Sequence, residues 1–274
     1  MPVARRIPAV LTIAGSDSGG GAGIQADLKA FAACGVHGTS AITAITAQNT
    51  VGVIAVHSVP PETILAQVRA VQSDIGIDAV KIGMLGNEPT IDAVARALDD
   101  LPESTPVVLD PVMVAASGAE LLDPGAQALL IELLLPRVSV ITPNVPEAEA
   151  LVAAATPSGS RREDLRVSEL ARELHALGPR AVVVTGGHRQ QAIDLFFDGS
   201  RLVEIPGERY PSSAAHGSGC THSSVLAARL ALGDDILGAA REAKRMAALA
   251  VRDGLAGIGR GAGPVDVLGL VRAD

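Results

Sequence analysis

Short runs of wholly apolar residues alternate with helix-forming segments along most of the chain, and few folds accommodate such a pattern. A run that is apolar on every residue is typical of a strand buried on both faces, as the strands of parallel sheets are. The sequence predicts strands over residues 9–14, 39–47, 51–59, 79–82, 106–109, 139–142, 181–185, 192–197 and 201–205. It predicts helices over residues 24–34, 61–74, 89–98, 124–135, 145–155, 167–177, 220–232 and 235–254. The alternation indicates an α/β fold, a three-layer α/β/α sandwich around a mostly parallel central sheet.

The chain contains no internal repeat and no change in composition that would separate two domains. Its length of 274 residues fits one large α/β unit, so we expect a single domain over residues 1–274. The pair Asp198-Gly199 predicts a hairpin between the last two strands.

Composition argues against several classes of partner. The chain has 30 acidic and 22 basic residues and a formal net charge of −8, which disfavours binding to nucleic acid or to an anionic membrane. One Tyr, three Phe and no Trp leave almost no aromatic platforms for stacked bases. No apolar stretch approaches membrane-spanning length, and the apolar run before residue 15 is too short for a signal peptide. The two cysteines, Cys34 (expected to be buried) and Cys220, are interpreted as free thiols in a reducing cytoplasm.

Polar and glycine residues follow the predicted strands at the points where these strands end. Ligands of open α/β sheets bind beyond the carboxyl ends of the strands, so residues there are expected to meet at one edge. The residues in such positions are Asp17, Gln48, Met84, Asp110, Asn144, Glu147, Gly186 and His188.

The segment from His216 to His222 places glycines directly before a predicted helix. The first N–H groups of a helix lack partners within the helix, and the helix dipole adds positive potential, so such a start can bind an anion. Cys220 lies there, and a helix start is expected to lower the pKa of its thiol. The alternative is an ordinary junction of a loop and a helix with small residues for close packing.

Two common nucleotide motifs are excluded. The spacing Gly21-x-Gly23-x-x-Ala26 fits a loose dinucleotide fingerprint, but the next predicted strand ends without the carboxylate that such a site needs. A P-loop is absent, because none of the three lysines follows a glycine.

Asp110, Asn144 and Glu147 supply oxygen ligands of the kind that Mg²⁺ accepts. A Mg²⁺ ion, an anion site at a helix start and a nearby base are the parts that phosphoryl transfer requires. Asn144 and Glu147 are equally interpretable as an N-cap and a first-turn acid, and both roles can hold together. Met84 could equally be core filling. The histidines match no zinc pattern.

The motifs as a set resemble those of the bacterial hydroxymethylpyrimidine/phosphomethylpyrimidine kinases of the ribokinase-like superfamily. The matching segments cover residues 14–27, 46–50, 81–85, 109–113, 142–147, 186–188, 216–221 and 261–265. The resemblance implies a ribokinase-like kinase that uses ATP and Mg²⁺ to phosphorylate 4-amino-5-hydroxymethyl-2-methylpyrimidine and then its monophosphate in thiamine biosynthesis. It also implies a homodimer, since such kinases usually form dimers.

The same resemblance implies roles for individual residues. Gln48 would bind the aminopyrimidine edge, and the other substrate-binding residues would be Gly15, Asp17, Ala22, Met84 and Val112. The catalytic anion hole would comprise Gly217, Ser218, Gly219 and Cys220. Nucleotide-binding residues would be Thr185, Gly187, His216 and Lys244, and the Mg²⁺ side would comprise Asp110, Asn144 and Glu147.

The sequence departs from the family pattern at two places. Thr185 stands where most members have Lys, and Ala214-Ala215 stands where many have Asn-Thr. Both changes affect regions that would handle phosphate. A pyridoxal or pyridoxine kinase of the same fold, or a pyrimidine-binding sensor that no longer turns over substrate, are the alternatives.

Overall fold

The computed structural model describes residues 6–114, 118–123, 125–156, 165–186, 192–212 and 214–270. Within these residues nine strands form one sheet in the order β3-β2-β1-β4-β5-β6-β7-β8-β9. The strands are β1 (Ala9–Asp17), β2 (His37–Asn49), β3 (Gly52–Ser58), β4 (Ala79–Ile82), β5 (Val107–Leu109), β6 (Val140–Ile141), β7 (Ala181–Val184), β8 (Asp194–Phe197) and β9 (Leu202–Ile205). The ladders from β2 through β7 are parallel, and β3, β8 and β9 join antiparallel at the two sides.

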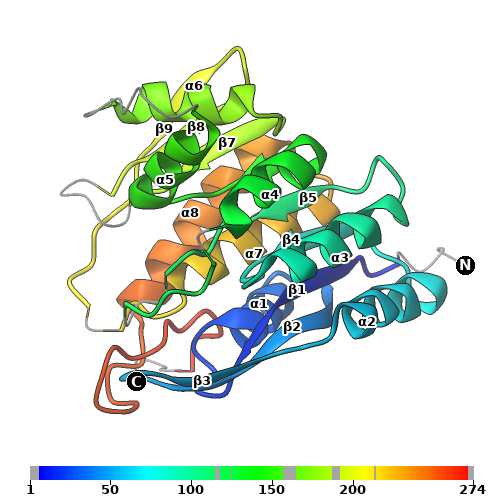
Figure 1. Ribbon diagram of the computed structural model, residues 1–274. Helices are drawn as coiled ribbons and strands as arrows, with labels where there is room; N and C mark the ends of the chain where they lie inside the picture. The colour runs from blue at the N-terminus through cyan, green and yellow to red at the C-terminus, as the bar shows by residue number, and fades with distance from the viewer. Residues whose placement is uncertain are drawn as a thin grey trace, which may run out of the picture.

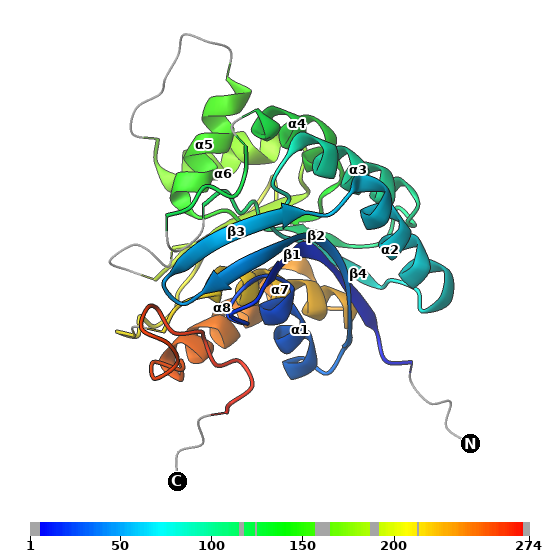
Figure 2. The same ribbon diagram turned by 60° about the horizontal axis from the view of Figure 1, so that its bottom comes forward.

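Helices cover both faces of the sheet (Figures 1 and 2). One face carries α1 (Gly23–Ala33), α7 (Ser218–Ala231) and α8 (Ile236–Arg252). The other face carries α2 (Pro61–Asp74), α3 (Glu88–Asp99), α4 (Ala126–Leu133), α5 (Val145–Ala155) and α6 (Val167–Ala176). The predicted three-layer α/β/α sandwich is therefore confirmed.

The central strands alternate between two hydrophobic cores. Leu11 and Ile13 of β1 pack toward α2–α6, whereas Val10 packs toward α1 and α7. Successive side chains of a strand point to opposite faces, so Thr12 lies on the same face as Val10. By the same alternation Lys81 of β4 shares the α1/α7 face with Ala79.

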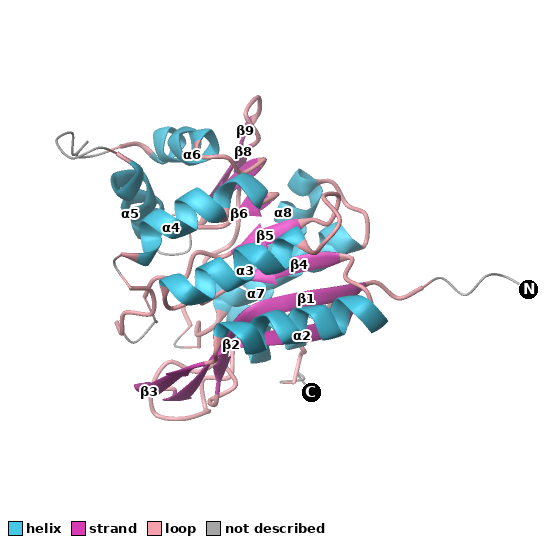
Figure 3. Cartoon of the chain, turned by 45° about the vertical axis from the view of Figure 1, so that its right-hand side comes forward, coloured by secondary structure: helices cyan, strands magenta, loops and turns pink. Residues whose placement is uncertain are grey.

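The hairpin of β2 and β3 projects beyond the other strands (Figure 3). It exposes apolar side chains, including Ile45, Ile54 and Val56. The segment near the carboxyl terminus lies against the tip of this hairpin, where the Gly261 N–H donates to Thr50 Oγ1 at 3.2 Å.

Most predicted elements occur within a few residues of their expected limits, and the differences have local causes. The helix predicted over 124–135 is α4, which ends at Leu133 and is followed by a 3-10 turn, Leu135–Arg137, with Pro136 in its first positions. Cys34 is only partly buried, because it follows the last residue of α1 and caps that helix. In the described part of the chain, no helix combines the length and apolarity needed to cross a bilayer.

Candidate active site

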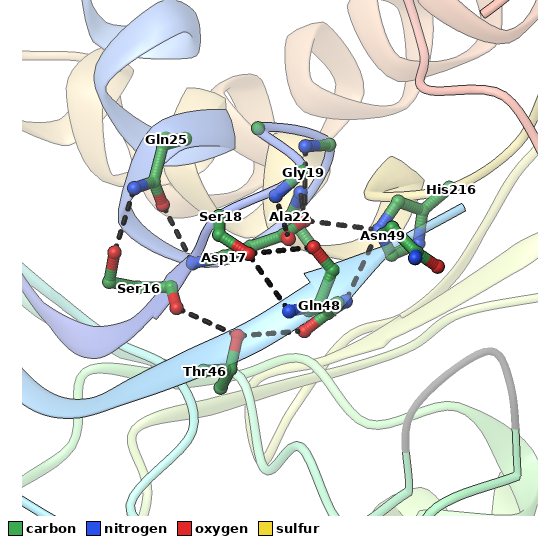
Figure 4. Close-up of polar contacts among 12 residues, drawn as sticks. Ser16, Asp17, Ser18, Gly19, Ala22, Gln25, Thr46, Gln48, Asn49 and His216 are labelled. Carbon is green, nitrogen blue, oxygen red and sulfur yellow. Dashed lines mark hydrogen bonds and ion pairs between the residues drawn. The ribbon is translucent and has the colours of Figure 1, made fainter. Parts of the chain in front are cut away.

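The carboxylate of Asp17 organises the glycine-rich loop that follows β1 (Figure 4). It is 3% exposed and accepts hydrogen bonds from the N–H groups of Gly19 (2.7 Å), Gly21 (3.0 Å) and Ala22 (2.8 Å). Burial by itself would raise the pKa of Asp17, but the contact with His216 and these N–H groups hold the pKa below its ordinary value. Asp17 is therefore a fixed negative charge at the end of β1.

His216 and Gln48 lie beside Asp17, although they come from distant parts of the chain (Figure 4). His216 Nε2 is 3.2 Å from Asp17 Oδ2 and 3.5 Å from Gln48 Nε2. A hydrogen bond to the carboxylate requires the proton on Nε2, so the ring cannot also accept from the Gln48 amide. The NH₂ group of Gln48 is therefore available to a ligand, while its Oε1 accepts from Thr46 Oγ1 at 3.2 Å.

A cleft of about 250 Å³ adjoins these side chains. It is lined by residues 48–52 at the end of the β2–β3 hairpin, by His216 and by residues 261–262. His216, which the sequence assigned to the nucleotide, thus lies on the same side of the site as Gln48.

The other residues that the sequence assigned to the substrate lie close to the ends of β1, β4 and β5. Met84 is buried, and a Cβ at Gly15 would lie 3.1 Å from its sulfur, so Met84 packs directly on the Gly15 backbone. Ala22 precedes α1, and Val112 is half-buried just after Asp110. The structure therefore brings small and apolar surfaces to the same edge of the sheet as Gln48.

The start of α7 is formed by a tight approach of two loops. Gly217 is the N-cap of α7 and has a left-handed φ of 81°. A Cβ at Gly217 would lie 1.8 Å from the carbonyl oxygen of Gly21, which only glycine avoids. In the described residues no hydrogen bond occupies the N–H groups of Gly219 and Cys220, whereas that of Ser218 donates to Ala215 O at 3.2 Å. We refer to residues 217–220 as the anion cradle, because these free donors combine with the helix dipole.

The prediction of a lowered pKa for the Cys220 thiol is wrong. Cys220 is partly buried, and the pKa of its thiol rises to about 12. Loss of hydration is the largest cause, and the nearby negative charges of Asp110 and Asp27 add to it, whereas Lys81 and the Gly23 N–H oppose it. A thiol in this setting is protonated at neutral pH.

Two carboxylates lie near each other at this edge of the sheet, and one of them, Asp110, is next to the start of α7. Asp110, after β5, is 6% exposed and accepts from Ser223 Oγ of α7 at 3.0 Å. Burial raises the pKa of Asp110, and burial together with the Asp110 charge raises the pKa of Glu147 to about 7. A cation placed between two such carboxylates would relieve both the repulsion and the burial penalty, so this donor set fits a divalent ion.

Asn144 and Glu147 form the helix-start device that the sequence left open as an alternative. The Asn144 side chain accepts from the Glu147 N–H at 2.9 Å, and Glu147 Oε2 accepts from the Asn144 N–H at 2.9 Å. This capping box at the start of α5 fixes the Glu147 carboxylate. Among the described residues no group of three or more His, Cys, Asp or Glu could enclose a metal, so the fit is to an ion that keeps water or substrate ligands.

The residues assigned to the nucleotide separate in the structure. Thr185 pairs with Asn144 in a parallel bridge, and its N–H donates to Pro143 O at 2.8 Å, so it lies beside the capping box. Lys244 of α8 lies buried against Asp194 of β8, with 2.6 Å between Nζ and Oδ1. Gly187 and His188 lie outside the described residues.

Sequence reasoning missed two buried clusters of charge next to the anion cradle. Asp27 and Lys81 form one, and Asp194, Lys244 and His222 form the other. A signal was present in the first case, because Lys81 is a charged residue inside the otherwise apolar strand of residues 79–82. A similar signal was present for Asp194, the one charged residue in the predicted strand of residues 192–197.

A mostly parallel sheet covered by helices on both faces, with a helix start and two neighbouring carboxylates at one edge, matches the small-molecule kinases of the ribokinase-like class. The sequence pattern of the family described as phosphomethylpyrimidine kinase matches residues 17–266. The chain is 50% identical over 262 residues to the hydroxymethylpyrimidine/phosphomethylpyrimidine kinase of Rhizobium meliloti, which covers 93% of this chain and 95% of that one. The chain therefore belongs to the phosphomethylpyrimidine kinase family, as its motifs predicted.

Two further similarities extend this result. The chain is 47% identical over 268 residues, 96% of its length, to the thiamine biosynthesis bifunctional protein ThiED of Geobacter sulfurreducens, but it spans only 53% of that protein. The structure of pyridoxal kinase from Staphylococcus aureus in complex with AMP-PCP and pyridoxal matches with a TM-score of 0.84 and 32% identity over 98% of this chain and 97% of that chain.

Proposed function

We propose that this protein transfers the γ-phosphoryl group of ATP to 4-amino-5-hydroxymethyl-2-methylpyrimidine and then to the resulting monophosphate. The observation that carries the proposal is the Gln48 amide, which has free NH₂ donors beside a cleft and next to the anion cradle. An aminopyrimidine edge presents a ring nitrogen that accepts and an amino group that donates, and a carboxamide complements both. Family membership and the relatives' names support the same substrate class.

In the proposed reaction the anion cradle binds the transferred phosphoryl group. The N–H groups of Gly219 and Cys220 donate to its oxygens, where negative charge accumulates in the transition state. A Cβ at Gly219 would meet only Asp110 Oδ2, at 4.0 Å, so a larger side chain there would fit against the protein but would extend into the space between the helix start and Asp110, where the phosphoryl group is proposed to bind. Cys220 contributes position and an uncharged thiol, because a thiolate would be repelled by the phosphoryl oxygens.

Asp110 and Glu147 would hold Mg²⁺, which when bound neutralises phosphate charge during transfer. Thr185, at the end of β7 beside Asn144, would lie near the phosphates, and Lys244 would act there through Asp194. Support for ATP comes from the AMP-PCP complex of the similar pyridoxal kinase.

We also propose that the chain is a single kinase domain that works in the cytoplasm as a homodimer. One sheet runs from β1 to β9, and the family match covers nearly the same residues. Two unpaired cysteines fit a reducing compartment. The exposed apolar residues of β3 provide a surface that a second copy would cover.

The test is ADP release by the purified protein with the hydroxymethylpyrimidine, its monophosphate and pyridoxal measured side by side. Turnover with both pyrimidines at higher kcat/KM than pyridoxal supports the proposal. Turnover with pyridoxal alone would make the protein a pyridoxal kinase, and tight pyrimidine binding without ADP release would make it a sensor.

Three variants assign the residues in the same assay. Gln48→Leu should weaken pyrimidine binding by about 1–3 kcal/mol, the usual cost of an unmade buried hydrogen bond, and pyridoxal binding by less. Gly219→Val should abolish turnover, because its side chain occupies the space of the phosphoryl group. Cys220→Ala should slow turnover and leave measurable activity; complete loss with intact binding of both ligands would make the thiol an essential base.

A further inference from the structure

A lysine and an aspartate that have no contact with solvent lie between the sheet and α1, beneath the anion cradle. The side chains of Lys81 and Asp27 are both 0% exposed, and Lys81 Nζ lies 2.9 and 3.1 Å from the two Asp27 oxygens. Removing two charges from water costs free energy, and their mutual attraction offsets this cost only when the geometry is good. Apolar residues of similar volume in place of a buried ion pair often leave the folded state equally stable. Stability alone is therefore a weak reason for this pair.

The Asp27 carboxylate connects four elements of the fold. Asp27 belongs to α1, and Lys81 reaches it from β4. Thr12 Oγ1 of β1 donates to Asp27 Oδ2 at 2.6 Å, and Ser224 Oγ of α7 donates to Oδ1 at 2.7 Å. Both oxygens are thus bound by an uncharged donor as well as by the ammonium, which holds α1 and α7 in one arrangement.

These contacts lie near the starts of both helices, one helical turn after Gly23 in α1 and one turn after Cys220, a residue of the first turn of α7. Asp27 follows Gly23, the first residue of α1, by four positions, and Ser224 follows Cys220 by four positions on α7. Residues four apart share a face of a helix, so the pair lies close to the two starts. The starts themselves touch where Gly217 packs on the Gly21 carbonyl, and the Gly23 N–H faces the Cys220 thiol.

The Lys81 charge lies close enough to Asp110 and Cys220 to act on both. The Lys81 charge affects the pKa of Asp110 more than the Asp27 charge does, and the same order holds for Cys220. The glycine after Ile82 makes room for this ammonium, since a Cβ at Gly83 would lie 2.7 Å from Lys81 Nζ. The absence of a side chain at Gly83 thus lets the Lys81 ammonium lie against the backbone at the end of β4.

We propose that Lys81 and Asp27 are positioning residues of this kinase. Their ion pair braces the starts of α1 and α7 against each other, and it presents fixed positive charge behind the donors that receive the phosphoryl group. The proposal rests on the kinase function proposed above. It predicts an effect on the chemical step, where charge moves onto the phosphoryl oxygens, and little effect on substrate binding.

The test uses Lys81→Met/Asp27→Leu, which replaces both charges with apolar side chains and should fold with near-native stability. We expect kcat to fall on the order of 10- to 100-fold, while KM for the pyrimidine changes by less than about threefold. The matched control is Arg69→Met/Asp100→Leu, which removes a solvent-exposed ion pair of 2.8 Å between the region of α2 and the end of α3 and should leave both constants unchanged.

A second measurement does not depend on any substrate. Alkylation of Cys220 by iodoacetamide, followed by mass spectrometry, should be about 3- to 10-fold slower in the double variant, because the Lys81 charge no longer favours the thiolate. Cys34 on the same chain is the internal control and should react at an unchanged rate. This assay keeps its meaning even if the pyrimidines prove not to be substrates.

A folded double variant with unchanged kcat and unchanged Cys220 alkylation overturns the proposal and leaves the pair a purely structural role. A fall in kcat of the double variant that is matched by an equal-fold rise in its KM for the pyrimidine would also count against the proposal. If the double variant does not fold, Asp27→Asn, which keeps the side-chain volume and an acceptor for Thr12 or Ser224, is measured in the same way. Unchanged values for that folded variant would overturn the proposal as well.

Discussion

Two buried lysine–aspartate pairs flank α7, and they differ in how completely their polar atoms are paired. Asp27 and Lys81 are fully enclosed, and both carboxylate oxygens of Asp27 have two partners. Asp194 Oδ1 likewise accepts from Lys244 at 2.6 Å and from the Gly186 N–H at 2.9 Å. Among the described residues, however, Asp194 Oδ2 has no hydrogen bond, and neither ring nitrogen of the buried His222 has one.

His222 Nε2 lies 3.3 Å from Asp194 Oδ2, which is within ion-pair range, although the contact does not have hydrogen-bond geometry. A fully paired network holds one arrangement, whereas a partly paired one gains when a ligand or a small shift supplies the missing partners. The incomplete pair lies beside Gly186, at the end of β7 on the proposed nucleotide side. The Asp27 pair is therefore the more tightly held of the two, whereas the Asp194 pair has buried polar atoms that lack a hydrogen-bond partner among the described residues.

The largest expected effect is on stability. Asp27→Ala leaves Lys81 charged and enclosed without a partner, which should cost about 3–5 kcal/mol of unfolding free energy. Asp194→Ala should cost less, about 1–3 kcal/mol, because the Lys244 side chain is 10% exposed whereas that of Lys81 is fully enclosed, and because one Asp194 oxygen is already unpaired. Urea unfolding of both variants measures the difference, and an equal or reversed order would contradict the contrast between the pairs.

The second prediction concerns nucleotide binding. Lys244→Met should raise KM for ATP on the order of 10-fold with a smaller change in KM for the pyrimidine, because it frees Asp194 and with it the Gly186 N–H. Initial rates at varied ATP and at varied pyrimidine separate the two constants. An increase in KM for the pyrimidine alone would show that the Asp194 pair does not contribute to nucleotide binding.

The third prediction uses the departure at Thr185, close to the incomplete pair. Thr185→Lys should restore a cation at the end of β7 and improve the second phosphorylation more than the first, by about 3- to 10-fold in kcat/KM. ADP release with each pyrimidine gives the two ratios. Equal improvement, or none, would indicate that another cation already serves the phosphates.

The smallest expected effect is on the pH dependence of stability. Burial alone would raise the pKa of Asp194, but His222 and Lys244 more than offset this and hold the pKa below its ordinary value. The unfolded chain therefore binds more protons in the acid range, so this stabilising contribution is present above the unfolded pKa and is lost as the pH falls through the folded pKa. Asp194→Asn should lose stability less steeply than the original chain between about pH 5 and pH 3. The free energy of unfolding is measured in urea at each pH for both proteins. If it falls equally steeply with pH in the variant and in the original chain, the neighbours of Asp194 do not stabilise its charged form.

Much of the fold could be predicted from the sequence because the signals are local. The central strands are almost wholly apolar, with Thr12 and Lys81 as exceptions, and prolines and glycines mark most of their limits. The helix Pro61–Asp74 and the strand Ala79–Ile82 occur at their predicted limits, whereas β1 and β2 run on to Asp17 and Asn49 through polar residues that pattern alone excludes from strands. The edge at which Asp110, Asn144 and Glu147 gather also followed, because parallel strands bring their carboxyl ends to one side.

The sequence by itself therefore determined the layers, the edge that carries the site and the family motifs, since each depends on residue type and short spacing. Only the tertiary structure decided the state of Cys220, the position of the His216 ring beside Asp17 and the pairing of Asp27 with Lys81. A pKa depends on burial and on charges that arrive from distant segments, and Asp17 and His216 are 199 residues apart. A helix start alone favours a thiolate, but the enclosing carboxylates and lost hydration outweigh it, and no local pattern contains those terms.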